Sequence, residues 1–251
     1  MLTRALAASP LKLLNPRNAG TSAWAYLVTF GGGLVGGDAL RIDVDVLDGS
    51  TALLATQAST KVYRSERGAS QELCAHIAGD GVLVMLPDPV TCFAGARYFQ
   101  EQRIHMDRRA SLVLVDRLTA GRVAFGERWA FHRYVSRTHV WRGGRRLLHD
   151  ALALTPEDGD IARRMGRFNC LALVVAIGPA IGATATRLLD ALGSAPISRG
   201  AEILCSAAPL EGDGVLVRIA AQSVEQVAVM LRDRLSIVTS LLGDDPWAAK
   251  W

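Results

Sequence analysis

Short runs in which hydrophobic and polar residues alternate dominate the first two thirds of the chain. Between residues 39 and 47, Leu40, Ile42, Val44 and Val46 occupy one side of a two-residue period, and charged residues occupy the other. This period is typical of a β-strand with one buried face. The same kind of pattern predicts strands at residues 12–14, 24–30, 69–78, 81–86, 98–106, 111–116, 131–141 and 146–152. Many short strands at near-regular spacing predict a mainly β fold built of layered, largely antiparallel sheets.

One predicted strand changes character along its length. Residues 52–65 start apolar and become polar, which predicts a strand that leads out of the core. Gln57, Ser59, Lys61 and Tyr63 would then share one face, because side chains two residues apart point to the same side of a strand. We expect a functional surface at this end.

The last third of the chain mixes strands and helices. Strands are predicted at residues 171–177, 201–207 and 215–221, and a short helix at 184–192 is closed by Gly193. A long second helix begins at Ser223, which forms a capping box with Gln226, and ends at Gly243. We therefore expect one domain over residues 1–251, with a mainly β core at 1–165 and a small β-α-β-β-α part with two helices at 166–251.

A glycine-rich stretch, Gly31 to Asp38, lies between two predicted strands. Gly31, Gly33 and Gly36 match the G-x-G-x-x-G pattern of dinucleotide-binding proteins, in which a helix must follow to hold the phosphates. Here a strand follows instead. We interpret the stretch as a turn that lets backbones approach closely and aims a poorly exposed Asp38 inward. A nucleotide-dependent oxidoreductase that uses these glycines is the alternative.

Composition narrows the class of protein. The chain has 251 residues and a formal net charge of +4, and its apolar runs are shorter than the roughly 18 residues of a membrane-spanning helix. Paired arginines without interleaved aromatic residues favour solvated faces over a nucleic-acid groove. The apolar part of the N-terminus is too short for a signal peptide. We expect a cytoplasmic protein that binds neither nucleic acid nor membrane.

Cysteines and histidines do not suggest a metal site. Four cysteines, Cys74, Cys92, Cys170 and Cys205, lie far apart, and we expect neither a C-x-x-C nor a C-x-H metal motif around them, only buried free thiols. The histidines at positions 132, 139 and 149 are also too spread for a local metal motif, and each is expected to be an ordinary surface or core residue.

Catalytic motifs are missing from the sequence, which contains no G-x-S-x-G, no H-E-x-x-H and no P-loop lysine. Carboxylates instead stand at predicted strand ends and turns. Asp116 ends an almost wholly apolar strand, where an unpartnered carboxylate would be costly to bury. These carboxylates could converge as a polar lining that suits exchangeable metal contact: Asp38, Asp88, Asp116, Glu127 and Asp150.

Four segments stand out along the chain: residues 32–38 (GGLVGGD), 58–65 (ASTKVYRS), 86–90 (LPDPV) with 93–96 (FAGA), and 116–122 (DRLTAGR) with Gly126-Glu127. In this order they resemble the UreD/UreH family of urease accessory proteins. The match covers about residues 31–127, and weaker similarity extends to the C-terminal helix. The resemblance implies a β-helix-like fold with a few helices.

The resemblance also implies a function. Members of the family are not enzymes; they bind the accessory protein UreF, and through it the GTPase UreG, and dock on apo-urease so that nickel reaches the active site. No tightly bound cofactor is implied, only a nickel ion in transit through an internal passage. Family members carry further N-terminal strands before the segment that matches Pro10-Leu11-Lys12, so an N-terminal edge of the fold is expected to differ here.

Carried over by motif, three carboxylates would line the passage: Asp38, Asp116 and Asp150. The residues expected to shape the core around them are Lys61, Tyr63, Arg64, Asp88, Arg122 and Glu127.

Overall fold

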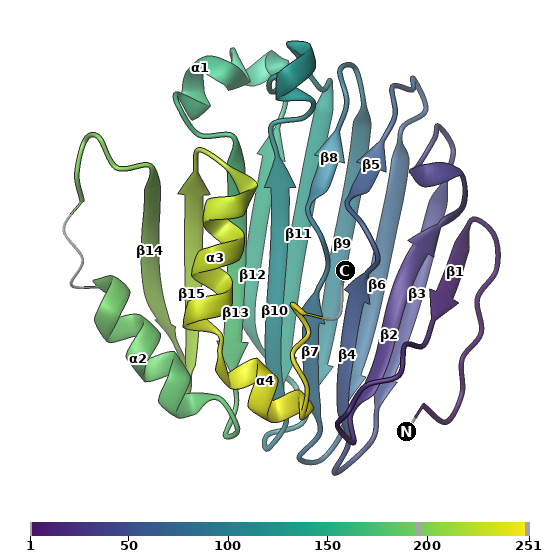
Figure 1. Cartoon of the computed structure of the whole chain (residues 1–251), viewed down its shortest axis with the longest axis vertical. Coiled ribbons are helices and arrows are strands. Elements are labelled where there is room, and N and C mark those ends of the chain that lie inside the picture. The colour runs from purple at the N-terminus through teal and green to yellow at the C-terminus, as the bar shows by residue number, and fades with distance from the viewer. Residues whose placement is uncertain (1, 194–196, 249–251) are drawn as a thin grey trace.

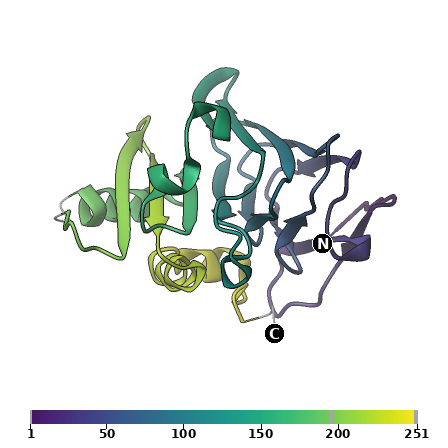
Figure 2. The same cartoon turned by 90° about the horizontal axis from the view of Figure 1, so that it is seen from above.

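Two facing β-sheets and a set of covering helices make up the structure, a computed structural model that describes residues 2–193 and 197–248. We call one sheet the front sheet, which lies directly behind α3 (Val224–Arg234) and α4 (Ile237–Leu242) in Figure 1, and the other, farther from the viewer, the rear sheet. The N-terminal strands and the α2–β14 unit lie at opposite ends of the stack in both views (Figures 1 and 2).

The front sheet holds strands from the whole length of the chain. In order across the sheet they are β1 (Leu11–Leu14), β2 (Ala23–Thr29), β4 (Thr51–Thr56), β7 (Val82–Leu86), β10 (Ser111–Thr119), β13 (Cys170–Ile177), β15 (Gly214–Ala221) and β14 (Ile203–Leu210). Two short strands, β5 (Thr60–Val62) and β8 (Val90–Cys92), pair with each other, and β8 also pairs with β10.

The rear sheet is built from the strands that alternate with these along the chain. In order they are β12 (Arg145–Leu154), β11 (Arg133–Arg142), β9 (Arg97–Met106), β6 (Ala69–Ile77) and β3 (Ala39–Val46). Between β2 and β11 the chain therefore winds from one sheet to the other like a solenoid, and the mainly β, β-helix-like prediction is confirmed.

Strand pairing in the centre of both sheets differs from the antiparallel expectation. β2, β4, β7 and β10 are parallel in the front sheet, as are β3, β6, β9 and β11 in the rear sheet. Successive strands such as β9 and β10 do not pair, because the connection carries the chain to the opposite sheet. Antiparallel pairs lie at the ends of the stack, where β1 meets β2, β11 meets β12, and β13 to β15 continue from β10.

The helices lie on the outer face of the front sheet or at the ends of the strands. They are α1 (Ile161–Met165), α2 (Gly182–Gly193), α3 (Val224–Arg234) and α4 (Ile237–Leu242), with short 3-10 turns at Phe30–Gly32, Val123–Phe125 and Pro156–Asp158. The predicted capping box is present: the Ser223 hydroxyl accepts from the Gln226 amide, and the Gln226 side chain accepts from the Ser223 amide. The predicted long helix is broken at Leu235 and Ser236, so α3 and α4 are separate.

Hydrophobic side chains form a core on each side of the front sheet. Val113 and Val115 of β10 face the helices and pack with residues such as Val227 and Leu231 of α3. Leu112 and Leu114 of the same strand face the rear sheet. This alternation makes the front sheet the middle layer of three at its C-terminal end (Figure 2).

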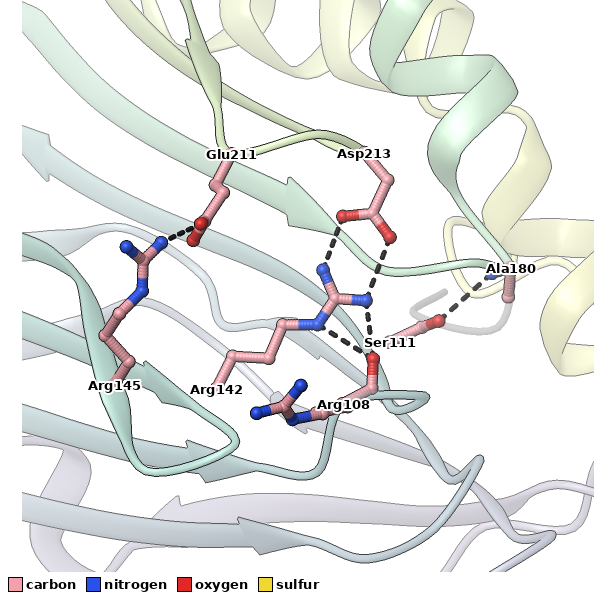
Figure 3. Close-up of polar contacts among 7 residues, drawn as sticks. All are labelled: Arg108, Ser111, Arg142, Arg145, Ala180, Glu211 and Asp213. Atoms are coloured by element: carbon pink, nitrogen blue, oxygen red, sulfur yellow. Dashed lines mark hydrogen bonds and ion pairs between the residues drawn. The ribbon is translucent and has the colours of Figure 1, made fainter.

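Ion pairs fasten the β14–β15 hairpin to the lower end of the solenoid (Figure 3). The Arg142 guanidinium, at the end of β11, donates to both carboxylate oxygens of Asp213, at 2.5 and 2.9 Å, and to the Arg108 carbonyl. Arg145 pairs with Glu211 beside it. The two-point contact of Arg142 fixes the hairpin more firmly than one hydrogen bond would.

The predicted strand over residues 52–65 is interrupted. It forms β4 and β5, with a bend between Thr56 and Thr60. The bend turns this segment into one rim of an internal cavity, and Lys61 is exposed there.

Candidate functional site

A belt of polar side chains crosses the space between the two sheets. On β9, the inward side chains run from Tyr98 through Gln100 and Gln102 to Ile104, so two amides separate apolar residues above and below. The inward side chains of β11 follow the same pattern, with Ser136 and Thr138 between apolar or aromatic residues. The belt therefore divides the inter-sheet core into an upper and a lower apolar cluster.

Strand register places these polar side chains at the same height. Gln71, Gln100 and Ser136 are direct neighbours across β6, β9 and β11. Gln102 is paired with Thr138, and Thr138 with Asp150 of β12, one step further along. Because parallel in-register strands repeat each position sideways, a local pair of polar residues becomes a row through the molecule.

Asp116 lies at the centre of the belt and comes from the opposite sheet. Its Oδ2 accepts hydrogen bonds from Gln100 Nε2 at 2.6 Å and from the Ser136 hydroxyl at 3.0 Å. Gln100 Nε2 also donates to Ser136 Oγ at 2.9 Å. The prediction that this strand-end carboxylate has partners is confirmed.

Burial raises the pKa of the Asp116 carboxyl, and the nearby Asp150 carboxylate adds to this effect. The hydrogen bonds from Gln100 and Ser136 oppose it, because they stabilise the charged form. Burial also raises the pKa of the Tyr98 and Tyr134 phenols well above their usual value, so both stay neutral. The Asp116 carboxyl is therefore hydrogen-bonded to neutral side chains, the Gln100 amide and the Ser136 hydroxyl.

Two cavities meet at Asp116. The first, of about 180 Å³, is lined by Gln100, Gln102 and Asp88 and reaches the bend between β4 and β5. The second, of about 240 Å³, is lined by Ser136 and Asp150 on the other side. Each is large enough for several water molecules. Asp116 lines both cavities and so lies between the carboxylates farther along each of them, Asp88 and Asp150.

Asp88 lies at the rim of the first cavity. The Thr56 hydroxyl accepts from the Asp88 amide at 2.7 Å and donates to its carboxylate at 3.2 Å. Arg117 Nη2 approaches the carboxylate at 3.7 Å and donates to the Pro87 carbonyl at 2.7 Å. The two prolines around Asp88 and these contacts hold the carboxylate in place, as the sequence indicated.

Asp150 forms the far side of the second cavity. Its carboxylate pairs with Arg218 of β15, and the two side chains are 17% and 55% exposed, respectively. The guanidinium is therefore the more accessible partner, at the surface end of the cavity. Of the three carboxylates expected to line one passage, Asp116 and Asp150 border the same cavity.

Asp38 lies elsewhere, and the expectation that it is aimed inward is wrong. Its carboxylate accepts from the Val35 amide at 2.8 Å and so closes the glycine turn on itself. The side chain is partly exposed and borders an open groove with Arg67 and Arg97, not the cavities at Asp116. The turn from Val35 to Asp38 explains this, because the Asp38 amide also donates to the Val35 carbonyl at 3.1 Å and the carboxylate is used within the same turn.

The glycine turn itself has the expected purpose. A Cβ at Gly33 would stand 2.7 Å from the Lys61 carbonyl and from a ring carbon of Tyr63. The Leu34 amide donates to the same carbonyl at 2.7 Å, which pins the turn against β5. The strand β3 follows, so the glycines do not open a helix as a dinucleotide site requires.

The remaining motif residues gather at the upper end of the strands. The Tyr63 ring meets Phe93 edge to face at 5.0 Å between centroids, and the Arg122 guanidinium lies 4.3 Å over the Phe93 ring. Arg122 also pairs with Glu127, and this contact lowers the pKa of the Glu127 carboxyl. Glu127 accepts from the Ala94 amide as well, so the four residues tie three loops together.

Arg64 and Lys61 flank this group without entering it. Arg64 bridges Ala96 through the backbone, and its side chain covers Gly95. Lys61 lines the mouth of the first cavity with its side chain exposed. Lys61 and Asp88 therefore belong to the cavity, whereas Tyr63, Arg64, Arg122 and Glu127 belong to the upper end of the fold.

Sequence reasoning missed the belt residues Gln71, Gln100, Gln102, Ser136 and Thr138. On β9 and β11 their signal is present, because each pair of polar residues interrupts an inward face that is otherwise aromatic or apolar and buried. It becomes visible only when the inward phase of each strand is known.

Comparisons with known proteins identify the family of the chain. A family model described as UreD urease accessory protein matches residues 1–250. The chain belongs to the UreD urease accessory protein family. It is 53% identical over 251 residues to the urease accessory protein UreD of Sorangium cellulosum (strain So ce56), which covers all of this chain and 80% of that protein.

Other relatives include bacterial, plant and fungal proteins. The urease accessory protein UreD of Anaeromyxobacter sp. (strain Fw109-5) is 48% identical, over 97% of this chain and 82% of its own length. The urease accessory protein D of Arabidopsis thaliana is 36% identical, over 95% of this chain and 92% of its own. Membership supports a role for this UreD-family chain in urease maturation.

No helix in the part of the chain that the structure describes could span a membrane. Within residues 2–193 and 197–248, none is both long and apolar enough to do so.

Proposed function

We propose that this protein is a non-catalytic, cytoplasmic accessory factor that binds apo-urease and the accessory proteins UreF and, through UreF, UreG, and helps nickel reach the urease active site. The match of the family model to residues 1–250 supports the accessory role. Nickel is the cargo in this proposal, and no tightly bound cofactor is part of it.

The polar belt is the route that we propose for the ion. The observation that carries this step is the position of Asp116, which lines both cavities. Carboxylate, amide and hydroxyl oxygens hold late transition metals less tightly than nitrogen or sulfur ligands do. A row of oxygen groups therefore suits an ion that must move on.

Asp88 and Asp150 would serve at the two ends of this route. Asp88 stands at the rim near the bend between β4 and β5, and Asp150 stands beside Arg218 at the other side. Arg218 would have to release Asp150 before the carboxylate could contact a cation, because a guanidinium and a metal ion compete for the same oxygens. Asp38 is left out of the route because it borders a different groove.

Exposed apolar side chains at the upper end support a protein-binding role. Phe125, Phe30 and Val35 are 78%, 57% and 54% exposed, respectively. They flank the glycine turn and the 3-10 turn at Val123–Phe125, which are linked through Tyr63, Phe93 and Arg122. Exposed aromatic and aliphatic groups on an ordered scaffold are typical of protein interfaces.

Deletion of the gene tests the accessory role. The deletion strain should make urease subunits in normal amounts that lack nickel and activity, which metal analysis of purified urease would measure. Normal nickel content in that strain would overturn the proposal.

Asp116 variants test the route. Asp116→Ala and Asp116→Asn should lower urease activation and nickel content by at least about tenfold, the usual scale for loss of a group that supports a metal site. Asp43→Asn is the matched control, because Asp43 is exposed on the outer face of β3 and pairs with Arg41 there.

Complex formation must be measured in parallel by co-purification with urease and the accessory proteins. Normal complexes with defective nickel transfer would support the route. Normal nickel transfer in both Asp116 variants would overturn it and leave the scaffold role standing.

A further inference from the structure

A cysteine and two histidines lie together on the outer face of the rear sheet, away from the polar belt. On β6, Leu73, Ala75 and Ile77 are buried between the sheets, so Cys74 and His76 point outward. The sequence Cys74-Ala75-His76 thus places two metal-ligating side chains side by side, and the expectation that no C-x-H spacing occurs is wrong.

Strand register supplies the third side chain. His76 of β6 is the direct neighbour of His105 of β9. One ligand atom each from Cys74, His76 and His105 can be chosen so that all three lie within 4.8 Å of one another. A tetrahedral site with bonds of about 2.3 Å to sulfur and 2.0 Å to nitrogen requires ligand atoms about 3.3 to 3.6 Å apart. Small side-chain rotations would close the difference.

Neighbouring groups hold the two imidazoles. Asp45 of β3, the register neighbour of His76, places a carboxylate oxygen 3.5 Å from His76 Nδ1. A carboxylate on one ring nitrogen orients the other toward a metal. The His105 ring lies between the His76 ring at 5.2 Å and the Trp141 ring at 4.5 Å, nearly parallel to both. These contacts restrict the rings before any metal binds.

The local charge also permits a cation. Arg103, the register neighbour of Cys74, is compensated by a 2.5 Å contact with Glu101.

We propose that Cys74, His76 and His105 form a binding site for a borderline divalent transition-metal ion such as Zn²⁺ or Ni²⁺, with water completing the coordination. Thiolate and imidazole ligands favour such ions over Mg²⁺ and Ca²⁺. The site goes beyond the proposed function, since it lies on the opposite face of the rear sheet from the belt at Asp116.

Cobalt titration of the purified full-length protein tests the proposal. Co²⁺ should bind at one site with a sulfur-to-cobalt charge-transfer absorption, and Zn²⁺ or Ni²⁺ should displace it. Cys74→Ser should abolish that absorption, and His105→Gln should weaken binding by at least about tenfold. Cys205→Ser and His132→Gln are matched controls, expected to leave both unchanged, because neither residue belongs to the cluster.

Alkylation gives a second measurement. Bound Zn²⁺ should protect Cys74 from iodoacetamide, as peptide mass analysis would show, while Cys205 modification stays unchanged. Circular dichroism of each variant shows whether it is folded. Unchanged cobalt absorption in Cys74→Ser, or loss of binding in His139→Gln with normal binding in His105→Gln, would overturn the assignment.

The outcome is separable from that of the proposed function. Asp116→Asn should keep the cobalt signal, whatever its effect on urease activation. Conversely, normal urease activation in Cys74→Ser would not contradict the metal site. It would show only that nickel delivery does not use this site.

Discussion

The two faces of the rear sheet carry different ligand chemistry on the same strands. Inside, β9 presents Gln100 and Gln102 on the face that Asp116 contacts. The possible metal ligands of this belt are carboxylate, amide and hydroxyl oxygens. Outside, the same strand presents His105 beside the thiol of Cys74. The two-residue period of a strand keeps these sets apart, so a substitution at one position changes one face only.

The faces also differ in how many hydrogen bonds their possible metal ligands already make. Asp116 accepts two hydrogen bonds, and a cation entering the belt must compete with Gln100 and Ser136 for the carboxylate. The imidazoles outside are mainly stacked and keep ring nitrogens available. We therefore expect brief contact inside and retention outside, which matches the softness of the two ligand sets.

Adjacent residues on β9 give the largest contrast between the faces. Ile104 is completely buried in the lower apolar cluster, so Ile104→Ala should lower the free energy of unfolding by about 2–5 kcal/mol through lost contacts and a cavity. His105→Ala, one residue away, should cost less than about 1 kcal/mol, because it loses mainly ring stacking. Urea unfolding followed by circular dichroism measures both. A larger loss in His105→Ala would contradict the assignment of faces.

Local patterns predict the strands well, but they do not predict the pairing. The alternation over residues 39–47 corresponds to β3 (Ala39–Val46), and the capping box at Ser223 is in place. By contrast, β9 pairs with β6 and β11 and not with β10, which follows it in the chain. Pairing depends on contacts between distant segments, and nothing in a single strand specifies its neighbour.

The candidate site shows the same limit. Asp116 is predictable, because an isolated carboxylate at the end of an apolar run must find a partner. Asp38 is misplaced by sequence reasoning because its carboxylate closes its own turn, a local bond that motif order does not reveal. His105 joins Cys74 and His76 only through strand register.

The cysteines divide in a way that their spacing does not show. Cys92 and Cys170 are buried as expected, and burial raises the pKa of their thiols to about 12 and about 11, respectively. Cys74 and Cys205 are partly exposed, so the expectation of buried thiols is wrong for these two. Whether a cysteine lies on the inner or the outer face of its strand, and not the number of cysteines, decides which thiol can bind metal.

Removal of the Ser136 hydroxyl should have an intermediate effect on the inner face. Ser136→Ala deletes a donor to Asp116 and an acceptor for Gln100, so it should lower the free energy of unfolding by about 1–2 kcal/mol at pH 7. Ser206→Ala, at an exposed position of β14, is the matched control and should change it by less than about 0.5 kcal/mol. Equal effects in the two variants would show that the belt is not a cooperative network.

The smallest expected effect is a change in pH dependence at Asp116. Burial raises the pKa of this carboxyl in the folded protein above its unfolded value of 3.8, so the folded state takes up a proton at a higher pH than the unfolded state does. As the pH falls from 7 through the folded pKa, the wild-type protein should therefore gain stability relative to Asp116→Asn, which cannot titrate. The gain should be complete near pH 3.8 and should stay constant below it. Urea unfolding of both proteins across this range measures the difference, in which the other carboxylates cancel. If the wild-type protein instead lost stability relative to Asp116→Asn on acidification, the hydrogen bonds from Gln100 and Ser136 would outweigh burial, and Asp116 would be a firmly ionised structural anchor within the belt.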